Sequence, residues 1–327
     1  MANIPVTADR ARLSRRARQF IQKLQRGDAF AHLITLLAAA SIIVVTVMLV
    51  YQLFINSALP RHKFGWEFFL GRTWDPVSGD FGALPFIYGT VISSALALLV
   101  AVPLGVGAAI FLSELAPLRI SNYLTFVIEL LAAVPSVIYG LLGIFILVPV
   151  LRQVVMPFLK STLGFLPLFK GPVYGVSMLA GGLVLAIMIV PFIISVSREV
   201  LLAVPVEQRE AALGLGATKW ESTWHVVVPF ARVGIMASVF LALARALGET
   251  MAVTMVIGND PKINASLFAP AYSIAAVIAN EFTEATGDLY LQALIELGLV
   301  LFLLTILING LARLVIIATT QKGTAQG

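Results

Sequence analysis

Long apolar stretches alternate with short polar segments along almost the whole of this chain. The apolar stretches cover roughly residues 31–55, 84–112, 121–148, 173–197, 231–258 and 289–318. Each reaches the ~20 residues that a helix needs to cross a ~30 Å hydrocarbon layer. They are continuously apolar, whereas the strands of a membrane barrel alternate between apolar and polar positions. The pattern therefore predicts an all-α integral membrane protein with six transmembrane helices.

The composition supports this prediction. Of 327 residues, 59% are hydrophobic and 12% are charged, against about 25% charged in an ordinary soluble domain. Lipid is therefore expected to be the main solvent of the side chains. The absence of cysteine excludes a disulfide framework and a cysteine-ligated metal. The three histidines have no neighbour at ligand spacing, so we expect neither a metal nor another cofactor.

Lysine and arginine are distributed unevenly among the polar segments. Residues 1–30 form a basic segment with Arg10, Arg12, Arg15, Arg16, Arg18, Lys23 and Arg26. A basic run can bind nucleic acid, but directly before an apolar span it sets topology, so no nucleic-acid partner is expected. With the N-terminus inside, fourteen of the 22 Lys and Arg residues fall in inner segments and seven in outer ones. Both termini are therefore predicted to be cytoplasmic.

The remaining segments complete the division of the chain. The first span, 31–55, is not followed by a cleavage site and should remain as a helix. Residues 56–83 are predicted to be an external loop at the membrane interface, because they contain a group of aromatic side chains. These side chains are Trp66, Phe68, Phe69 and Trp74. Residues 270–284 are too short to span and should lie at the outer surface or dip into the bundle. The transmembrane domain covers 84–318, with a cytoplasmic tail over 319–327.

One charged island, residues 207–230, interrupts the apolar second half of the chain. Gly214 or Gly216 can supply a left-handed helix cap. Thr218 and Glu221 match a capping box that begins a second helix. The island is thus predicted to be two helices joined by a tight glycine turn, within a cytoplasmic loop over 198–230. From the residues alone, it could be no more than a surface hairpin that joins two spans.

The letters of the island point to a family. "EAALGLG" followed by "VVVP" resembles the EAA loop of ABC importer permeases. The matching residues are Glu210, Ala211, Ala212 and Gly216, then Val226, Val228 and Pro229, where the second helix should end. The resemblance implies an ABC type-1 importer permease architecture, with this loop docking on a cytoplasmic ATP-binding subunit. The chain has no G-x-x-x-x-G-K-[ST] phosphate loop, so we expect no enzymatic activity, with ATP hydrolysis in the partner.

Two ionisable residues, Arg245 and Glu249, lie within the predicted fifth span. An arginine at the centre of a membrane helix costs about 2.5–3.5 kcal/mol on insertion scales. Four residues apart, the two should share one helix face and look into the bundle past small side chains. Those small residues are Ser238, Ala242, Gly248 and Ala252. The pair could be a structural ion pair; the sharper hypothesis is that the Arg245 guanidinium meets an anion in transit.

Three further stretches narrow the resemblance to the PstC type of phosphate-specific ABC importer permease. They are "RALGETMAVTMVIGN" with Arg245 and Glu249, "FGALPFIYGT" at 81–90 and "VPSVIYGL" at 134–141. The resemblance implies that Arg245 and Glu249 lie on a phosphate pathway in the bacterial cytoplasmic (inner) membrane. It also implies three partners: a homologous permease of the PstA type, cytoplasmic ATP-binding subunits and an extracytoplasmic phosphate-binding protein.

Other functions remain open at this point. Within the same class, a permease for molybdate or sulfate would have a similar sequence. In another class, an ion-coupled secondary carrier would use Arg245, Glu249 and Glu129 as coupling groups. Glu129 and Glu296, which also interrupt apolar runs, could either partner Arg245 or have a structural role.

Overall fold

The structure is a computed structural model that describes residues 28–324. Most of the predicted basic segment, residues 1–27, lies outside the described residues, as do residues 325–327 of the predicted tail. The chain divides into two compact units, one up to Ile55 and one from Asn56 onward. In its described part, the first unit consists of helix α2 (Asp28–Asn56) up to Ile55. Its 27-residue apolar portion, Phe30–Asn56, matches the predicted first span.

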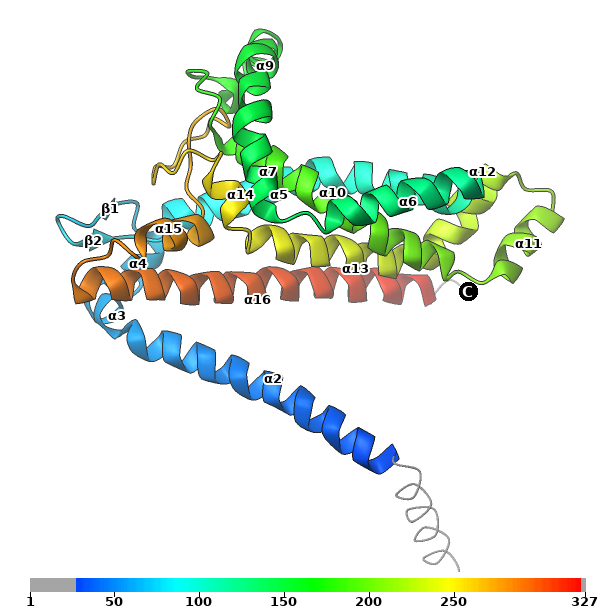
Figure 1. Cartoon of the computed structure of the whole chain (residues 1–327), viewed down its shortest axis with the longest axis horizontal. Coiled ribbons are helices and arrows are strands. Elements are labelled where there is room, and N and C mark those ends of the chain that lie inside the picture. Colours follow the sequence, from blue (N-terminus) through cyan, green and yellow to red (C-terminus); the bar gives the residue numbers. More distant parts are fainter. Residues whose placement is uncertain (1–27, 325–327) are drawn as a thin grey trace, which may run out of the picture. The chain divides into compact units, whose positions relative to one another are not determined.

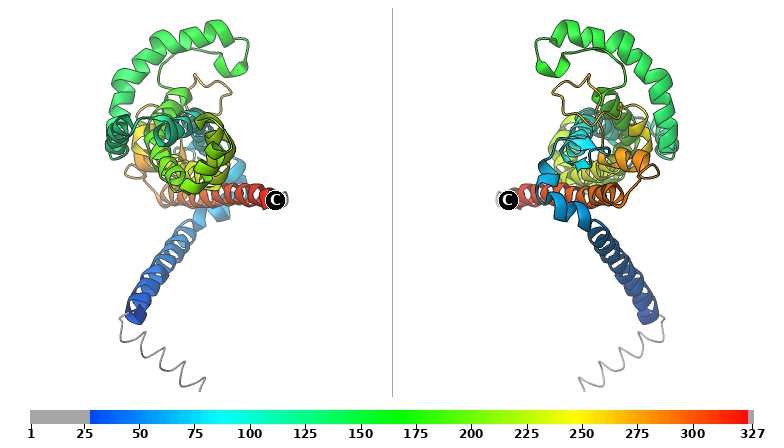
Figure 2. Two further views of the ribbon diagram at one scale, coloured as in Figure 1. Left: turned by 90° about the vertical axis from the view of Figure 1, so that its right-hand side faces the viewer. Right: turned by 90° about the vertical axis from the view of Figure 1, so that its left-hand side faces the viewer.

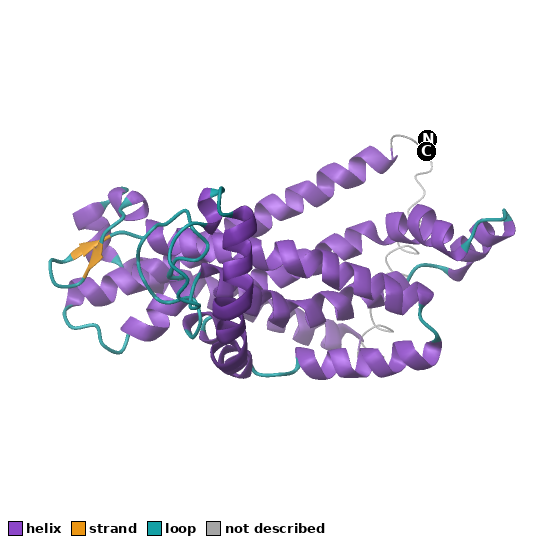
Figure 3. Ribbon diagram, turned by 90° about the horizontal axis from the view of Figure 1, so that it is seen from above, coloured by secondary structure: helices purple, strands orange, loops and turns teal. Residues whose placement is uncertain are grey.

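The second unit is mostly helical (Figure 1 and Figure 3). Its α-helices are α3 (Ala58–Phe64), α4 (Glu67–Leu70), α5 (Leu84–Ile110), α6 (Leu118–Ala132), α7 (Ser136–Leu142), α8 (Val148–Val150), α9 (Met156–Leu163), α10 (Met178–Leu202), α11 (Val206–Gly214), α12 (Lys219–Ser222), α13 (Val228–Leu247), α14 (Met251–Thr254), α15 (Ile274–Glu281) and α16 (Asp288–Thr324). Four π-helical segments are η1 (Phe111–Leu115), η2 (Gly143–Leu147), η3 (Leu151–Val155) and η5 (Thr223–Val227), and η4 (Pro167–Phe169) is a 3₁₀ turn. Two short antiparallel strands, β1 (Trp74–Asp75) and β2 (Asp80–Phe81), form a hairpin.

Six helices of the described chain are long and apolar enough to cross a membrane. Besides the span in α2, they are Leu84–Leu115, Ser136–Leu163, Met178–Leu202, Lys219–Leu247 and Asp288–Leu314. Their number and the all-α class confirm the prediction from the hydrophobic pattern. The bounds of the second and sixth spans also agree to within a few residues, whereas the third and fifth differ.

The third span is the largest correction. The predicted stretch 121–148 straddles a break, because α6 ends at Ala132 and the apolar helix begins only at Ser136. Pro135 causes the break: the residue before a proline disfavours helical geometry, and proline donates no N–H. The apolar helix then continues to Leu163, so Arg152 and Lys160 lie on it rather than in an outer loop. It leaves the direction of α5, α10, α13 and α16 and curves outside them (Figures 1 and 2).

Three of the π-helical segments directly precede prolines within continuing helices. η2 is followed by Pro149, η3 by Pro157 and η5 by Pro229, each at the first or second position of the next α-helix. A proline inside an α-helix removes one hydrogen bond and clashes with the carbonyl four residues earlier. A π-helical turn changes that spacing and lets the helix continue.

The packing of α5 along α10 forms the centre of the second unit. Small residues allow the approach: a Cβ on Gly105 would lie 2.7 Å from Cγ2 of Ile193, and one on Gly182 2.5 Å from Cδ2 of Leu96. A second cluster, with Ala109, Leu112, Leu201 and Val227 among its buried members, packs the α5, α10 and α13 segments nearest the 198–230 loop. Close helix–helix contact through small residues is typical of membrane bundles.

The aromatic segment 56–83 is folded into the protein rather than spread along an interface. Phe68, Trp74 and Phe81 are buried in a cluster with residues of α15 and α16. The Trp74 indole N–H donates to the Glu281 carboxylate at 2.8 Å. The prediction of an interfacial segment therefore fails for Phe68 and Trp74, although Trp66 is exposed.

The segment that includes α15 enters the bundle, which is one of the two predicted placements for 270–284. Ile274, Ala276 and Val277 of α15 are buried, and the Ile274 N–H donates to Thr90 Oγ1 of α5 at 2.9 Å. Burial also raises the pKa of Tyr272 to about 12. This phenol therefore stays neutral, and it accepts a hydrogen bond from the Asn280 side-chain amide.

Two glycines of α5 allow a matched test of the contact with the α15 segment. A Cβ on Gly89 would lie 2.1 Å from the Tyr272 carbonyl oxygen, whereas a Cβ on Gly107 would meet nothing within 4 Å. Gly89→Ala should therefore destabilise the protein by about 1–3 kcal/mol, the usual cost of overpacking. Gly107→Ala should not destabilise the protein, because alanine is the better helix former. Thermal unfolding in detergent measures both, and equal midpoints for the two variants would contradict the contact.

Candidate functional site

The charged island has the predicted helix–turn–helix geometry. Helix α11 ends at Gly214, and Gly216 takes the left-handed conformation with φ +91°. The capping box is also present: Thr218 Oγ1 accepts from the Glu221 N–H, and the Glu221 carboxylate accepts from the Thr218 N–H at 2.8 Å. Of the two candidate glycines, Gly216 is therefore the one whose backbone requires glycine.

The second helix of the island does not end at Pro229 as predicted. After α12, the π-helical segment η5 leads directly into α13, which continues to Leu247. The island is thus joined without a break to the fifth span, Lys219–Leu247. A displacement of the turn at Gly216 would reach that span through continuous helix.

The residues that match the EAA signature divide between two environments. Glu210, Ala211 and Gly216 are exposed, whereas Ala212 is buried. Leu215, at the tip of the turn, is 91% exposed. The exposed set forms an accessible edge that a partner protein can contact. Leu215 was not among the predicted residues, although an apolar side chain between two glycines is a signal for it.

Arg245 and Glu249 do not share one helix face, which corrects the prediction. Arg245 lies in the last turn of α13, Gly248 caps that helix, and Glu249 lies beyond its end. The Glu249 Oε1 atom instead accepts from the Ala252 N–H, at the start of α14, at 3.2 Å. The two side chains form no ion pair in the part of the chain that the structure describes. Glycine is a poor helix former, and the predicted span 231–258 breaks at Gly248.

Arg245 also faces outward from this chain, not into its bundle. Its side chain is exposed, whereas Ser238 and Ala242 on the same helix are buried. The guanidinium Cζ lies 5.9 Å from the centre of the Phe192 ring on α10, within the range of a cation–π interaction. The cation thus lies over one aromatic ring and remains open on one side.

The structure brings the stretches around the two helix breaks together. Helix α7, from "VPSVIYGL", packs against α14, from "RALGETMAVTMVIGN". A Cβ on Gly140 would lie 2.4 Å from the Met255 sulfur and 3.2 Å from the Ala252 Cα. Irregular backbone at membrane depth is tolerated only where protein buries it or where it lines a water-filled path.

Comparison with known families decides the class of the chain. The model of the family described as "Binding-protein-dependent transport system inner membrane component" matches residues 101–318, well over half of the sequence. The chain belongs to this family.

Several proteins that are similar to this chain are named phosphate transport system permease protein PstC. The one from Mesorhizobium japonicum is 49% identical over 297 residues, which cover 90% of this chain and 91% of that protein. The one from Haemophilus influenzae is 46% identical over 291 residues, 88% of this chain and 92% of that protein. The one from Xylella fastidiosa strain 9a5c is 43% identical over 301 residues, 91% and 93% of the two chains. The resemblance to the PstC type is therefore confirmed.

Two solved transporters show a more distant likeness. A structure of the MetNI methionine ABC transporter is 17% identical with a TM-score of 0.45, covering 72% of this chain and 94% of that one. A structure of an amino acid ABC transporter is 20% identical with a TM-score of 0.46, covering 75% of this chain and 98% of that one.

The other ionisable residues of the apolar runs form no ion pair with Arg245 in the described part of the chain. Glu296 of α16 is 2% exposed, and its charged neighbour is Arg61 of α3. Glu129 is exposed on α6. No group of three His, Asp or Glu side chains with metal-binding geometry occurs within the described residues.

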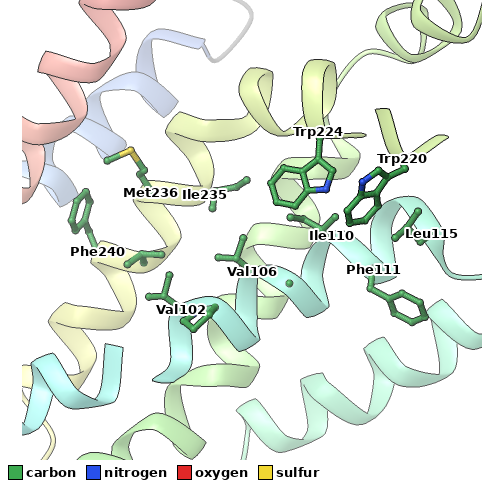
Figure 4. Close-up of a pocket in the computed structure, with 13 residues that line it drawn as sticks. Val102, Val106, Ile110, Phe111, Leu115, Trp220, Trp224, Ile235, Met236 and Phe240 are labelled. Carbon is green, nitrogen blue, oxygen red and sulfur yellow. The ribbon is translucent and has the colours of Figure 1, made fainter. Parts of the chain in front are cut away.

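An apolar pocket of about 690 Å³ lies between the end of α5 and the second helix of the island (Figure 4). On one side lie residues of α5 and η1, including Ile110, Phe111 and Leu115. Trp220 and Trp224, from α12 and η5, lie opposite, with their rings in edge contact at 5.6 Å. Arg245 is not among the residues that line this pocket.

The two glycines of the turn give a matched pair of substitutions. Gly216→Ala places a side chain in the left-handed region at a cost of about 1–2 kcal/mol. Gly214→Ala adds a side chain to the last position of a helix, where a Cβ would meet nothing within 4 Å. Hydrogen exchange over residues 207–222 should therefore accelerate in the first variant only. Identical exchange in both variants would show that the turn does not depend on Gly216.

Proposed function

We propose that the chain is the transmembrane permease subunit of an ATP-driven importer that translocates inorganic phosphate across the bacterial cytoplasmic membrane. The supporting observation is the Arg245 guanidinium, held at a helix break with one open side, in a chain 49% identical to a protein named as a phosphate transport permease. A guanidinium offers a planar fork of N–H donors that suits phosphate oxygens.

The outward position of Arg245 fits a pathway between two permeases. This chain contributes one wall, and a homologous permease of the PstA type contributes the other. Glu249, nearby but outside the helix, tempers the positive charge so that the anion is released, because a transit site must bind without trapping. Its carboxylate can also accept a hydrogen bond from a proton-bearing oxygen, which hydrogen phosphate has and sulfate lacks at neutral pH.

The energy for transport comes from the other subunits. Cytoplasmic ATP-binding subunits dock on the exposed edge formed by Glu210, Ala211 and Gly216, with Ala212 packed beneath it. An extracytoplasmic phosphate-binding protein delivers the anion to the opposite side. Both termini are cytoplasmic in this arrangement. In the assembled transporter, the Gly216→Ala variant should also release the ATP-binding subunits during purification.

Competition defines the substrate. The complete transporter, with its binding protein, should take up radiolabelled phosphate, and unlabelled phosphate should abolish the signal. Sulfate and molybdate in equal excess should leave uptake unchanged. Neither anion bears a proton at neutral pH, so neither can donate a hydrogen bond to the Glu249 carboxylate. Uptake that molybdate or sulfate suppresses as well as phosphate does would assign the permease to another oxyanion.

Arg245→Gln should abolish phosphate uptake while the complex still assembles, because glutamine keeps a polar side chain but removes the charge and the fork. Arg245→Lys should retain a reduced rate, since lysine keeps the charge alone. Arg232→Gln is the matched control, because Arg232 is also exposed on α13. Uptake assays with copurification of all subunits measure the series. Normal uptake by Arg245→Gln would exclude a role in translocation.

A further inference from the structure

Arg209 is the most extensively bonded side chain of the island, although it lies outside the EAA signature. Its Nε atom donates to Oε2 of Glu114 at 3.1 Å, and its Nη2 atom donates to Oε1 of the same carboxylate at 2.9 Å. This is a bidentate arginine–carboxylate pair, the geometry with the strongest and most directional hydrogen bonds. Arg209 is 19% exposed and Glu114 10%, so water screens the pair little.

The same guanidinium also binds the end of α10. Nη2 donates to the Leu201 carbonyl at 2.8 Å, and Nη1 donates to the Val204 carbonyl. Leu201 lies in the last turn of α10 and Val204 two residues beyond its end, a region where the helix dipole favours positive charge. One side chain of α11 thus joins the π-helical end of α5, through Glu114, to the end of α10.

Apolar packing holds α11 only weakly. Ala212 is the only residue of α11 that is buried. On the side of Trp220 and Trp224, the apolar pocket separates the island from the end of α5 (Figure 4). Arg209 is therefore the side chain of α11 that fixes this helix to both Glu114 and the end of α10.

Helix α10 connects the Arg209–Glu114 pair to the proposed anion site. Leu201, whose carbonyl accepts from Arg209, and Phe192, whose ring faces Arg245, are nine residues apart on the same helix. At 1.5 Å per residue, that separation is about 14 Å of continuous helix. A shift of the α10 end has a short and direct route to the ring that positions Arg245.

We infer that the Arg209–Glu114 pair is the joint that transmits movement of the ATP-binding subunits into α5 and α10, and that Arg209 is a positioning residue for transport. This inference rests on the proposed function. Arg209 touches neither the anion nor ATP; it fixes α11 to the two helices that the anion site depends on. Loss of the joint should leave ATP hydrolysis running while transport per ATP falls.

The test uses the complete transporter in proteoliposomes and measures phosphate moved per ATP hydrolysed. Glu114→Gln keeps the shape of the side chain but removes its charge, and should lower that ratio at least about fivefold, the lower end of typical coupling between sites. Arg209→Lys keeps the charge but cannot reach the carboxylate and both carbonyls together, so it should lower the ratio less. Glu199→Gln is the matched control, because Glu199 pairs with Arg198 in the same region but is 71% exposed, where ion pairs contribute little.

The outcomes separate the inference from the proposed function. Wild-type transporter without phosphate uptake would overturn the proposed function itself. The joint would be supported if the Glu114→Gln transporter copurifies with all subunits and has a lowered ratio of phosphate moved per ATP. The wild-type and Glu199→Gln transporters should then have equal ratios. An unchanged ratio in Glu114→Gln would overturn it. If Glu114→Gln fails to assemble, Arg209→Lys decides: a lowered ratio in the assembled complex supports transmission, whereas a normal ratio, or failure of both variants to assemble, overturns it.

Discussion

The need to satisfy every backbone polar group inside a hydrocarbon layer governs the rest of this structure. Each helix break frees peptide groups that must find partners within the protein. The first N–H groups of α10 illustrate this: Ser177, Met178 and Leu179 donate to carbonyls of Val256, Ala269 and Leu267. The loop after α14 is thus fixed onto the start of α10. The same requirement places the two helix breaks next to each other, where α7 packs on α14, and so creates the irregular region beside Arg245.

Charge follows the same rule in this protein. Arg209, which is mostly buried, has four hydrogen bonds to a carboxylate and two carbonyls. Arg245 has the face of one aromatic ring and an open side. Removing one partner of a buried ion pair destabilises the folded protein by about 3–5 kcal/mol. Arg209 is therefore suited to a fixed joint. An exposed cation with weak partners is suited to a ligand that binds and leaves.

Hydropathy predicts how many spans exist better than where they break. The count of six depends only on the length of apolar runs, and the helix–turn–helix of the island depends on local caps at Gly216 and Thr218. Both were predictable from the sequence. The break at Pro135 lies inside an apolar run, and so does the one at Gly248, so neither interrupts the hydropathy signal. The pairing of Arg209 with Glu114 crosses 95 positions of the chain, which no local spacing reveals.

Helix α10 connects the Arg209–Glu114 pair to Arg245 because it contacts both arginines and also packs against α5. Along its length it packs against α5, and small residues bring the two helices into direct contact. At its end it accepts from Arg209, and at Phe192 it faces Arg245. Closely packed interiors are stiff and pass on displacements instead of absorbing them. Because α5 is held by Glu114 at the same joint, α5 and α10 should move together. In the function proposed above, the anion pathway would then open by their joint motion against α7 and α14, each of which follows a helix break.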